Sequence, residues 1–407
     1  MKHLLPVIFL VCLVIFPRGS AQDAPTRSDG SAFLRPCYFT SWAQYRPGRG
    51  QYSTTNYIPG LCTHILYAFA TFKADFTMKA DDPTDLVGDD GGPGQYQLVN
   101  NLKNQQPGLK TLLSIGGGAF GTAQFQKMSF NKTTRTKFIN SAVGWVRKYN
   151  FDGIDIDWEF PLKKDQKYIA VLQELRAAIN AEAQKSGKDK LLLTVAVTST
   201  YDTMPGYDIV KMGPLLDFVN VMTYDFWYPS VGTTGMNAPL YNRTGLGEPA
   251  KFYNVVWAAN AWHNWGIPKE KVIVGIAPYA HGWTLKNASK IQPGSTGNTA
   301  SPALKFSQEK GAAAYYEICE MLAAGAKRYW HAQHEVPWLI QNNKQWYSYD
   351  DAESVELKMD FIKDNDFGGA FVWTLDLDDF NGKCSNGNGT LYPIIGTIAR
   401  ELGGVDI

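Results

Sequence analysis

Eight short apolar runs with strand character alternate with helical segments along most of the chain. The clearest helical pattern is Lys164–Lys185, where Tyr168, Leu172, Leu175 and Ile179 recur at intervals of three and four. Eight strand–helix units without a dinucleotide-binding glycine fingerprint favour an α/β fold of the (β/α)8 TIM barrel type over a doubly wound sheet. The eight expected strands are Arg35–Ser41, Thr63–Thr71, Lys110–Gly116, Gly153–Glu159, Leu191–Ser199, Asp217–Asp225, Val272–Tyr279 and Gly369–Leu377.

The spacing between the last two strands is far too long for a single helix. It contains a helical pattern at Gly311–Ala324 and strand-like pieces around Trp338 and Trp346. We therefore expect a small α+β insertion domain at 281–349, after strand seven, with the barrel formed by 32–280 and 350–402. Loops that follow barrel strands lie at the C-terminal mouth, so the insertion is expected to form one wall of the active site.

The N-terminus has the features of a secretory signal. A short basic start precedes the apolar run Leu4–Phe16, and Gly19-Ser20-Ala21 offers small residues for cleavage. The run is too short to span a bilayer. We expect residues 1–21 to be removed, 22–31 to form a flexible leader, and the mature protein to be secreted and extracellular.

Composition excludes several classes of protein. With 44% hydrophobic and 19% charged residues the chain is not a disordered polyelectrolyte, and 39 basic against 38 acidic side chains give no support to nucleic-acid or membrane-surface binding. Aromatic residues make up 13% of the chain, which suits either sugar stacking or ordinary core packing.

Four cysteines remain after the signal, which allows three pairings. Proximity in the sequence favours Cys37–Cys62 and Cys319–Cys384, and a metal site is the poorer interpretation because no C-x-x-C spacing occurs. Four sequons are possible glycosylation sites in a secreted protein. They begin at Asn131, Asn242, Asn287 and Asn388.

The densest chemical signal is the segment Asp152–Glu159, which reads DGIDIDWE. Side chains alternate along a strand, so Asp155, Asp157 and Glu159 share one face, expected to point into the barrel, and Ile154, Ile156 and Trp158 take the other. Burial and mutual repulsion must hold at least one of the three carboxyls protonated near neutral pH.

Glu159, nearest the C-terminal end of the strand, is the natural general acid. Asp157 is placed to share its proton, and Asp155 lies deeper. There are two alternatives: a solvated acidic face of an edge strand, and a site for a hard cation. We rank both lower, because both faces of the strand are used and cation sites usually draw ligands from several loops. Asp152 is out of phase with the ladder and is expected to make hydrogen bonds at the start of the strand.

These residues resemble the D-x-x-D-x-D-x-E motif of the family 18 glycoside hydrolases, the chitinases and chitinase-like lectins. Five further segments of the chain resemble strands of that family in the same order. They are Cys37–Trp42 with Cys62–Phe69, Ser114–Gly117, Met222–Asp225 and the strand that carries Trp373. The resemblance implies the same barrel, the insertion after strand seven and the two disulfides favoured above.

The resemblance also implies a retaining, substrate-assisted mechanism in which the N-acetyl carbonyl of the substrate is the nucleophile. Glu159 would protonate the glycosidic oxygen, Asp157 would orient the acetamido group, and Tyr224 and Asp225 would complete the catalytic set with Asp155. No cofactor or metal is required. The residues expected to bind substrate are Tyr38, Trp42, Phe69, Gly116, Gly117, Met222, Trp227, Tyr279, His281 and Trp373.

The expected function is a secreted endochitinase that hydrolyses β-1,4 linkages between N-acetylglucosamine units of chitin and chito-oligosaccharides. A non-catalytic chito-oligosaccharide-binding lectin, or an endo-β-N-acetylglucosaminidase acting on N-glycans, are the alternatives. Gly118, Ala119 and His281 replace residues usual in animal chitinases, a Trp and an Asn after Gly117 and an Arg at position 281. The expected partner is the carbohydrate substrate, with no nucleic acid, no membrane and a monomeric state.

Overall fold

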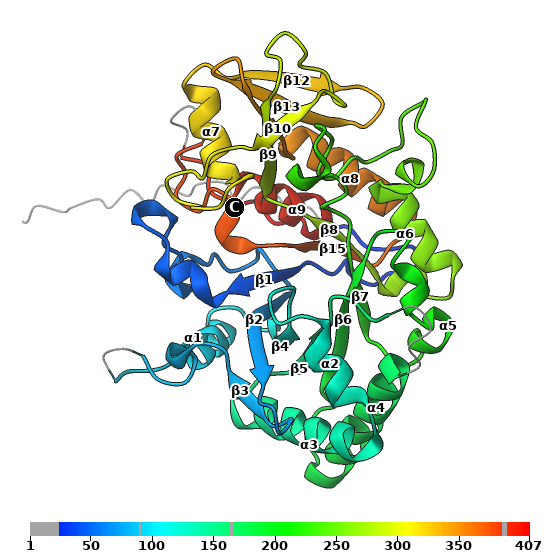
Figure 1. The fold of residues 1–407 in the computed structure, drawn as a ribbon. Coiled ribbons are helices and arrows are strands. Elements are labelled where there is room, and N and C mark those ends of the chain that lie inside the picture. The colour runs from blue at the N-terminus through cyan, green and yellow to red at the C-terminus, as the bar shows by residue number, and fades with distance from the viewer. Residues whose placement is uncertain (1–23, 89–90, 163–166, 385–388) are drawn as a thin grey trace, which may run out of the picture.

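A closed barrel of parallel strands forms the centre of the computed structural model, which describes residues 24–88, 91–162, 167–384 and 389–407. Its strands are β1 (Pro36–Thr40), β2 (His64–Phe72), β4 (Lys110–Gly116), β5 (Gly153–Asp157), β6 (Leu192–Thr198), β7 (Phe218–Met222), β8 (Val272–Ile276) and β15 (Gly369–Val372). They pair in the order β1-β15-β8-β7-β6-β5-β4-β2, and β1 also pairs with β2, so the sheet closes (Figure 1). The predicted (β/α)8 barrel is therefore confirmed.

Each of the eight expected runs corresponds to one barrel strand; β2 extends one residue past its run, to Phe72, and several other runs continue past the strand end. β5 ends at Asp157, which leaves Glu159 in the loop at the C-terminal mouth. The expected run Val272–Tyr279 joins two elements, because β8 ends at Ile276 and a strand of another sheet, β9 (Tyr279–Leu285), begins at Tyr279. A short strand, β3 (Met78–Ala80), pairs antiparallel with β2 beyond the barrel.

Helices surround the barrel. The predicted helix at Lys164–Lys185 corresponds to α4, whose neighbour α3 is joined to it by the ion pairs Arg135–Glu174 and Arg147–Glu182. The barrel helices are α1 (Gln95–Asn101), α2 (Thr122–Ser129), α3 (Lys132–Lys148), α4 (Lys167–Ser186), α5 (Ile209–Met212), α6 (Val255–Asn264), α8 (Ala352–Asp364) and α9 (Pro393–Gly403).

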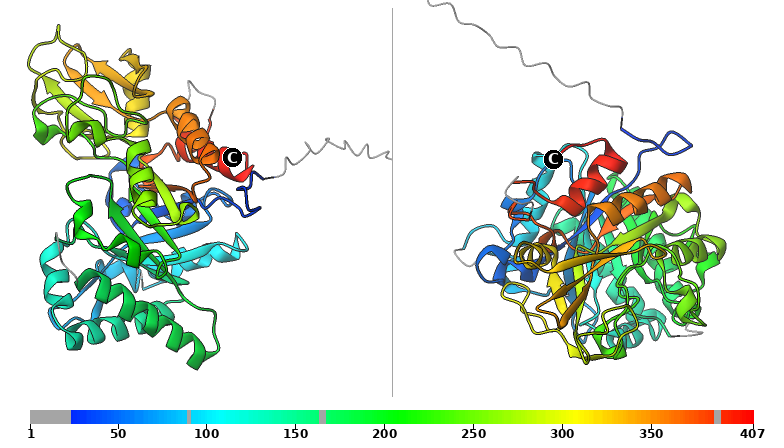
Figure 2. Two further views of the ribbon diagram at one scale, coloured as in Figure 1. Left: turned by 90° about the vertical axis from the view of Figure 1, so that its right-hand side faces the viewer. Right: turned by 90° about the horizontal axis from the view of Figure 1, so that it is seen from above.

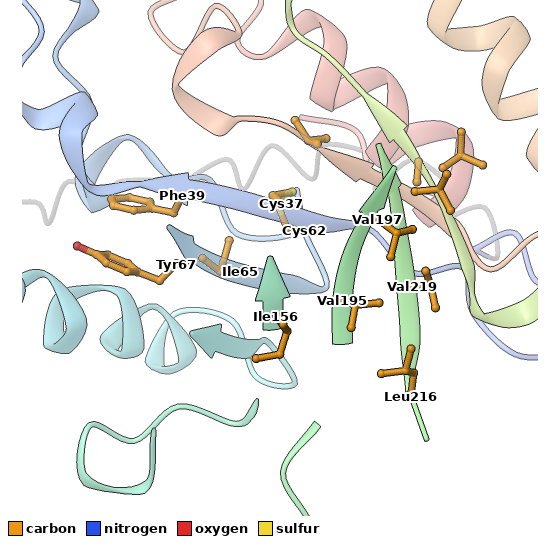
Figure 3. Close-up of a cluster of buried hydrophobic side chains, with 14 of the residues drawn as sticks. Cys37, Phe39, Cys62, Ile65, Tyr67, Ile156, Val195, Val197, Leu216 and Val219 are labelled. Atoms are coloured by element: carbon orange, nitrogen blue, oxygen red, sulfur yellow. A yellow bond between two sulfur atoms is a disulfide. The ribbon is translucent and has the colours of Figure 1, made fainter. Parts of the chain in front are cut away.

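The main core lies between the barrel and these helices. Branched side chains on the outer face of successive strands, such as Ile156, Val195 and Val219, are fully or almost fully buried in it (Figure 3). This follows from the period of two along each strand, which directs alternate residues outward. The disulfide Cys37–Cys62 ties β1 to the residues before β2.

The predicted α+β insertion is a six-stranded sheet with one helix, stacked on the barrel and reached through β9 (Figures 1 and 2). It begins at Tyr279, two residues before the expected boundary. Trp283, Trp338 and Trp346 form part of its own core. The second expected disulfide, Cys319–Cys384, ties its helix to the loop after β15. Its remaining elements are β10 (Gly297–Ala300), β11 (Ala312–Ala314), α7 (Tyr315–Ala323), β12 (Lys327–His331), β13 (Val336–Gln341) and β14 (Gln345–Ser348).

The N-terminal predictions fall partly outside the described residues. The expected signal, 1–21, lies wholly outside them. Within the expected leader, Arg27 is buried and its guanidinium donates to the carbonyl oxygen of Asp366 at 3.1 Å, so this part of the segment packs against the barrel. No helix of the described chain has both the length and the apolar character that a membrane span requires.

One buried ion pair connects the end of the insertion to the barrel. Nζ of Lys358 on α8 lies 2.6 and 2.7 Å from the two carboxylate oxygens of Asp350, and both side chains are fully or almost fully buried. Removing one partner of such a pair leaves a buried charge without compensation.

We predict that Lys358→Met lowers the free energy of unfolding by about 3–5 kcal/mol, measured by urea titration. The added Asp350→Asn substitution should recover part of the loss, because it removes the orphaned charge. The control is Arg400→Ala, which breaks a half-exposed pair with Glu356 and should change stability by less than about 1 kcal/mol. Equal losses in Lys358→Met and Arg400→Ala would contradict the prediction.

Candidate active site

A groove runs across the C-terminal mouth of the barrel. It consists of two adjoining depressions of about 780 and 750 Å³ that share Trp42, Asp225 and Trp373. The first holds Asp157, Glu159, Met222 and Tyr224, with Tyr38, Phe69, Gly118, Ala119 and Ala196. The second extends toward the insertion and is lined by residues that include Arg46, Tyr279, His281 and Glu309.

The carboxylate ladder points into the barrel as the strand alternation predicts. Asp155 is completely buried, and its carboxylate accepts hydrogen bonds from three different strands. The donors are the hydroxyls of Tyr38 at 2.8 Å, Ser114 at 2.7 Å and Thr194 at 2.6 Å. A solvated edge strand is excluded by this burial, and the deepest carboxylate is satisfied by neutral hydroxyl donors.

The environment of Asp157 differs from that of Asp155. Only 2% of it is exposed, yet its Oδ1 atom has no hydrogen-bond partner among the described residues. Burial, followed by the charges of Glu159 and Asp155, raises the pKa of Asp157 well above its ordinary value. A buried carboxylate oxygen without a donor is costly, and here it faces a groove from which a ligand could supply one.

Glu159 lies just past the end of β5, half-buried at the floor of the groove. Burial, with a smaller contribution from the charge of Asp225, raises its pKa to about 7. A Cβ added to Gly118 would lie 3.3 Å from the Glu159 carboxylate, so the glycine leaves open space beside it. Glu159 is therefore divided between its acid and its ionised form near neutral pH, as proton transfer requires.

The opposite side of the groove carries a second hydrogen-bonded group. Oδ1 of Asp225 accepts from the Tyr279 hydroxyl at 2.6 Å and lies 2.7 Å from Nε2 of His281. Desolvation alone would raise the pKa of Asp225, but the hydrogen bonds and the charge of His281 outweigh it, so this pKa is lowered. Burial would lower the pKa of His281, and Asp225 more than reverses that effect. The pair lies between the two depressions, and each partner favours the charged form of the other.

Stacked aromatic rings form another part of the groove floor. Trp373 stacks with Phe69 at 5.8 Å between ring centroids, and Phe69 stacks with Trp42 at 5.9 Å. Tyr38 meets Trp373 edge-on at 5.1 Å. These four residues were all predicted from the sequence, and the structure brings them together.

Three predicted substrate-binding residues lie outside the groove. Trp227 does not line it: its ring packs against Gly235, where a Cβ would lie 2.2 Å away, and its indole N–H donates to the Thr233 carbonyl. Gly116 and Gly117 do not line the groove either. A Cβ at Gly116 would lie 2.2 Å from the carbonyl oxygen of Asp157, and one at Gly117 would lie 2.5 Å from the ring of Phe69. Both glycines allow close packing behind the floor.

Several residues that line the groove were not predicted from the sequence. Ala196 had a usable signal, because the inward parity of β6 directs it to the barrel interior. Arg46, whose guanidinium pairs with the buried Asp376, and Glu309 lie outside the strands and carry no periodic signal.

Other sequence predictions find a place away from the groove. Asp152 accepts from the backbone N–H of Thr111 at 2.8 Å, as expected of a residue at a strand start. Three sequon asparagines, Asn131, Asn242 and Asn287, are exposed, and Asn388 lies outside the described residues. Within the described chain, no group of three or more His, Cys, Asp or Glu side chains is arranged to hold a metal ion.

Comparisons with known proteins agree on one family. The family model described as "Glycosyl hydrolases family 18" matches residues 35–378. The chain is 51% identical to a probable endochitinase of Caenorhabditis elegans over 97% of its own length, and it spans 63% of the length of that relative.

Two solved structures share the fold. An immunomodulatory active chitinase from Trichuris suis has a TM-score of 0.87 at 42% identity, covering 91% of this chain and 99% of the other. Human YKL-39, described as a pseudo-chitinase with retained chitooligosaccharide binding, has a TM-score of 0.86 at 35% identity, covering 91% and 100%.

The groove electrostatics lead to a titration prediction. Asp225→Asn removes a negative charge that favours the protonated form of Glu159, so the pKa of Glu159 should fall from about 7 while burial keeps it above its ordinary value. The measurement is the pH dependence of carboxyl 13C shifts in protein labelled at glutamate. Asp360→Asn, an exposed change on α8, is the control and should leave the titration in place. An unmoved midpoint in Asp225→Asn would contradict this electrostatic account.

Proposed function

The chain belongs to the family 18 glycosyl hydrolases, and from that membership we propose that it is a secreted chitinase. It hydrolyses β-1,4 linkages between N-acetylglucosamine units of chitin and chito-oligosaccharides, with retention of configuration. The endochitinase relative at 51% identity supports the substrate class. The apolar run in residues 1–21 supports secretion.

The observation that carries the proposal is the pair Glu159 and Asp157. One carboxyl at the groove floor has a pKa of about 7, and its buried neighbour presents an oxygen without a hydrogen-bond donor. A sugar bearing a 2-acetamido group supplies both missing partners: a glycosidic oxygen for the proton of Glu159 and an amide N–H for Oδ1 of Asp157. Ordinary retaining glycosidases instead use a second carboxylate as nucleophile.

The reaction then follows from these positions. Glu159 protonates the glycosidic oxygen, and the acetamido carbonyl oxygen attacks the anomeric carbon as the leaving group departs. Asp157 holds the amide N–H and stabilises the positive charge of the oxazolinium-type intermediate. Tyr224 hydrogen-bonds the acetamido oxygen. Water next attacks the anomeric carbon with Glu159 as base, which restores the acid and the configuration.

The shape of the groove suits an oligosaccharide. Trp373 lies where the two depressions meet and is partly exposed, which makes it the floor for the sugar that reacts. The exposed Trp42 and the Asp225–His281 pair continue the lining on either side. Aromatic faces and charged hydrogen-bonding groups along one open groove are what a chain of sugars requires.

A non-catalytic lectin is the second candidate, because the likeness to human YKL-39 extends over nearly the whole chain. The experiment offers purified protein a fluorogenic chito-oligosaccharide and a high-mannose glycoprotein. We expect cleavage of the first alone. Binding without cleavage would support the lectin, and release of the glycan would support an endo-β-N-acetylglucosaminidase.

In the same assay Glu159→Gln should lower turnover by at least 10³-fold, since it removes the only proton donor of the first step. Binding of the oligosaccharide, followed by tryptophan fluorescence, should remain measurable because the groove is unchanged. Glu356→Gln, on the outer surface of α8, is the matched control and should keep full activity. Retained turnover in Glu159→Gln would refute the assignment of the acid.

The pH dependence has a definite sign. Glu159 must be protonated to act as the acid, and its pKa is about 7, so kcat/KM should be constant on the acidic side of this limb and fall as the pH rises through about 7. The measurement is kcat/KM on the fluorogenic substrate from pH 5 to pH 9. A fall in kcat/KM centred near the ordinary glutamate pKa would show that burial does not raise the pKa of Glu159.

A further inference from the structure

A second pocket lies behind the loop that carries Asp225, between the segment joining β7 to α6 and the insertion. This side pocket is a depression with about 460 Å³ of empty space, part of it open to solvent, and its lining includes Phe226, Trp227, Arg243, Tyr253 and His334. None of its lining residues also lines the groove, so the two spaces are separate.

The aromatic walls of the side pocket are fixed in advance, and their polar atoms are already used. The indole N–H of Trp227 donates to the Thr233 carbonyl at 2.9 Å, and the hydroxyl of Tyr253 donates to Asp202 at 2.8 Å. The rings of Phe226 and Tyr253 stack at 6.3 Å between centroids. These walls therefore offer apolar surface to a ligand without having to rearrange.

Two polar groups of the lining have no hydrogen-bond or ion-pair partner on the side chain among the described residues. His334 is 94% buried, and neither of its ring nitrogens has a hydrogen-bond partner among the described residues. Arg243, half-buried beside it, has no hydrogen bond or ion pair to any acid in the described chain. Burial, with the neighbouring His331 and Arg243, lowers the pKa of His334 to about 3, so the positive charge of the pocket belongs to Arg243.

An unpaired guanidinium and an unsatisfied imidazole beside apolar walls define the chemistry of the occupant. A carboxylate accepts two parallel hydrogen bonds from a guanidinium and a further one from a neutral imidazole N–H. We propose that the side pocket binds a small aryl or alkyl carboxylate, its apolar body against Phe226, Trp227 and Tyr253 and its carboxylate on Arg243 and His334.

The alternative occupant is a glycan attached to this chain. Asn242 begins a sequon and also lines the pocket, so a glycan attached there would compete for the same space. The glycan is neutral at its first sugars and leaves the charge of Arg243 uncompensated, so the charge favours the carboxylate. The Asn242→Gln variant separates the two, because it removes the glycan and keeps both polar groups.

The test uses phenylacetate as the probe and phenylacetamide as its neutral counterpart, followed by saturation-transfer NMR on the full chain. We expect saturable binding of phenylacetate to the wild type and to Asn242→Gln, and at least tenfold weaker binding of phenylacetamide. Arg243→Gln should weaken phenylacetate at least tenfold, and Arg243→Lys less, because it keeps the charge without the planar fork. Arg400→Gln on α9 is the control and should bind as the wild type does.

Several results would overturn the proposal. They are equal affinity for the two probes, unchanged affinity in Arg243→Gln, absence of binding in both the wild type and Asn242→Gln, and binding in Asn242→Gln alone, which would assign the pocket to the glycan. Displacement of phenylacetate by a chito-oligosaccharide would place the probe in the groove and would also overturn it. The proposal stands apart from the chitinase activity, since each of these outcomes is read without turnover.

Discussion

The rest of the structure depends on three inward-pointing carboxyl groups, two on strand β5 and the third, Glu159, just past its end. Charges of like sign in a desolvated barrel interior raise one another's pKa unless donors compensate them. Burial raises the pKa of Asp155, and three hydroxyls that donate to it, from β1, β4 and β6, offset part of that rise. Only a closed barrel brings those strands around one carboxylate, so the ladder depends on closure of the sheet. Without that compensation all three protons would compete, and no single group would be tuned to act near neutral pH.

The three carboxyls differ in burial and in hydrogen bonding, and this difference gives them separate roles. Asp155 is fully satisfied, Asp157 lacks a partner for one oxygen, and Glu159 reaches the groove. Asp155 has three hydroxyl donors, whereas Glu159 has one backbone donor, Gly118, and lines the groove where a ligand can reach it. The unsatisfied oxygen is a cost to the folded protein that a bound acetamido group removes, so the site favours its ligand by leaving one hydrogen bond for it to make.

The walls of the groove depend on contacts between segments far apart in the sequence. The Cys319–Cys384 disulfide ties the insertion to the loop after β15, the buried Lys358–Asp350 pair fixes the segment that follows the insertion, and the insertion carries His281 to Asp225. A rigid connection of this kind keeps the second depression aligned with the first. The side pocket forms at the same junction, where the insertion meets the loop after β7.

The sequence by itself determined the barrel, the insertion, both disulfides, the inward carboxylates and most of the aromatic floor. These features depend on local periodicity, because alternation along β5 alone decides that Asp155 and Asp157 face inward and Trp158 outward. Only the tertiary structure decided the rest. The ring of Trp227 packs against Gly235, and Gly116 and Gly117 allow close packing behind the groove floor. Arg46 and Glu309, which were not predicted, line the groove. Residues beyond the strand ends follow no period, and their positions are set by partners that the chain brings near them only when it is folded.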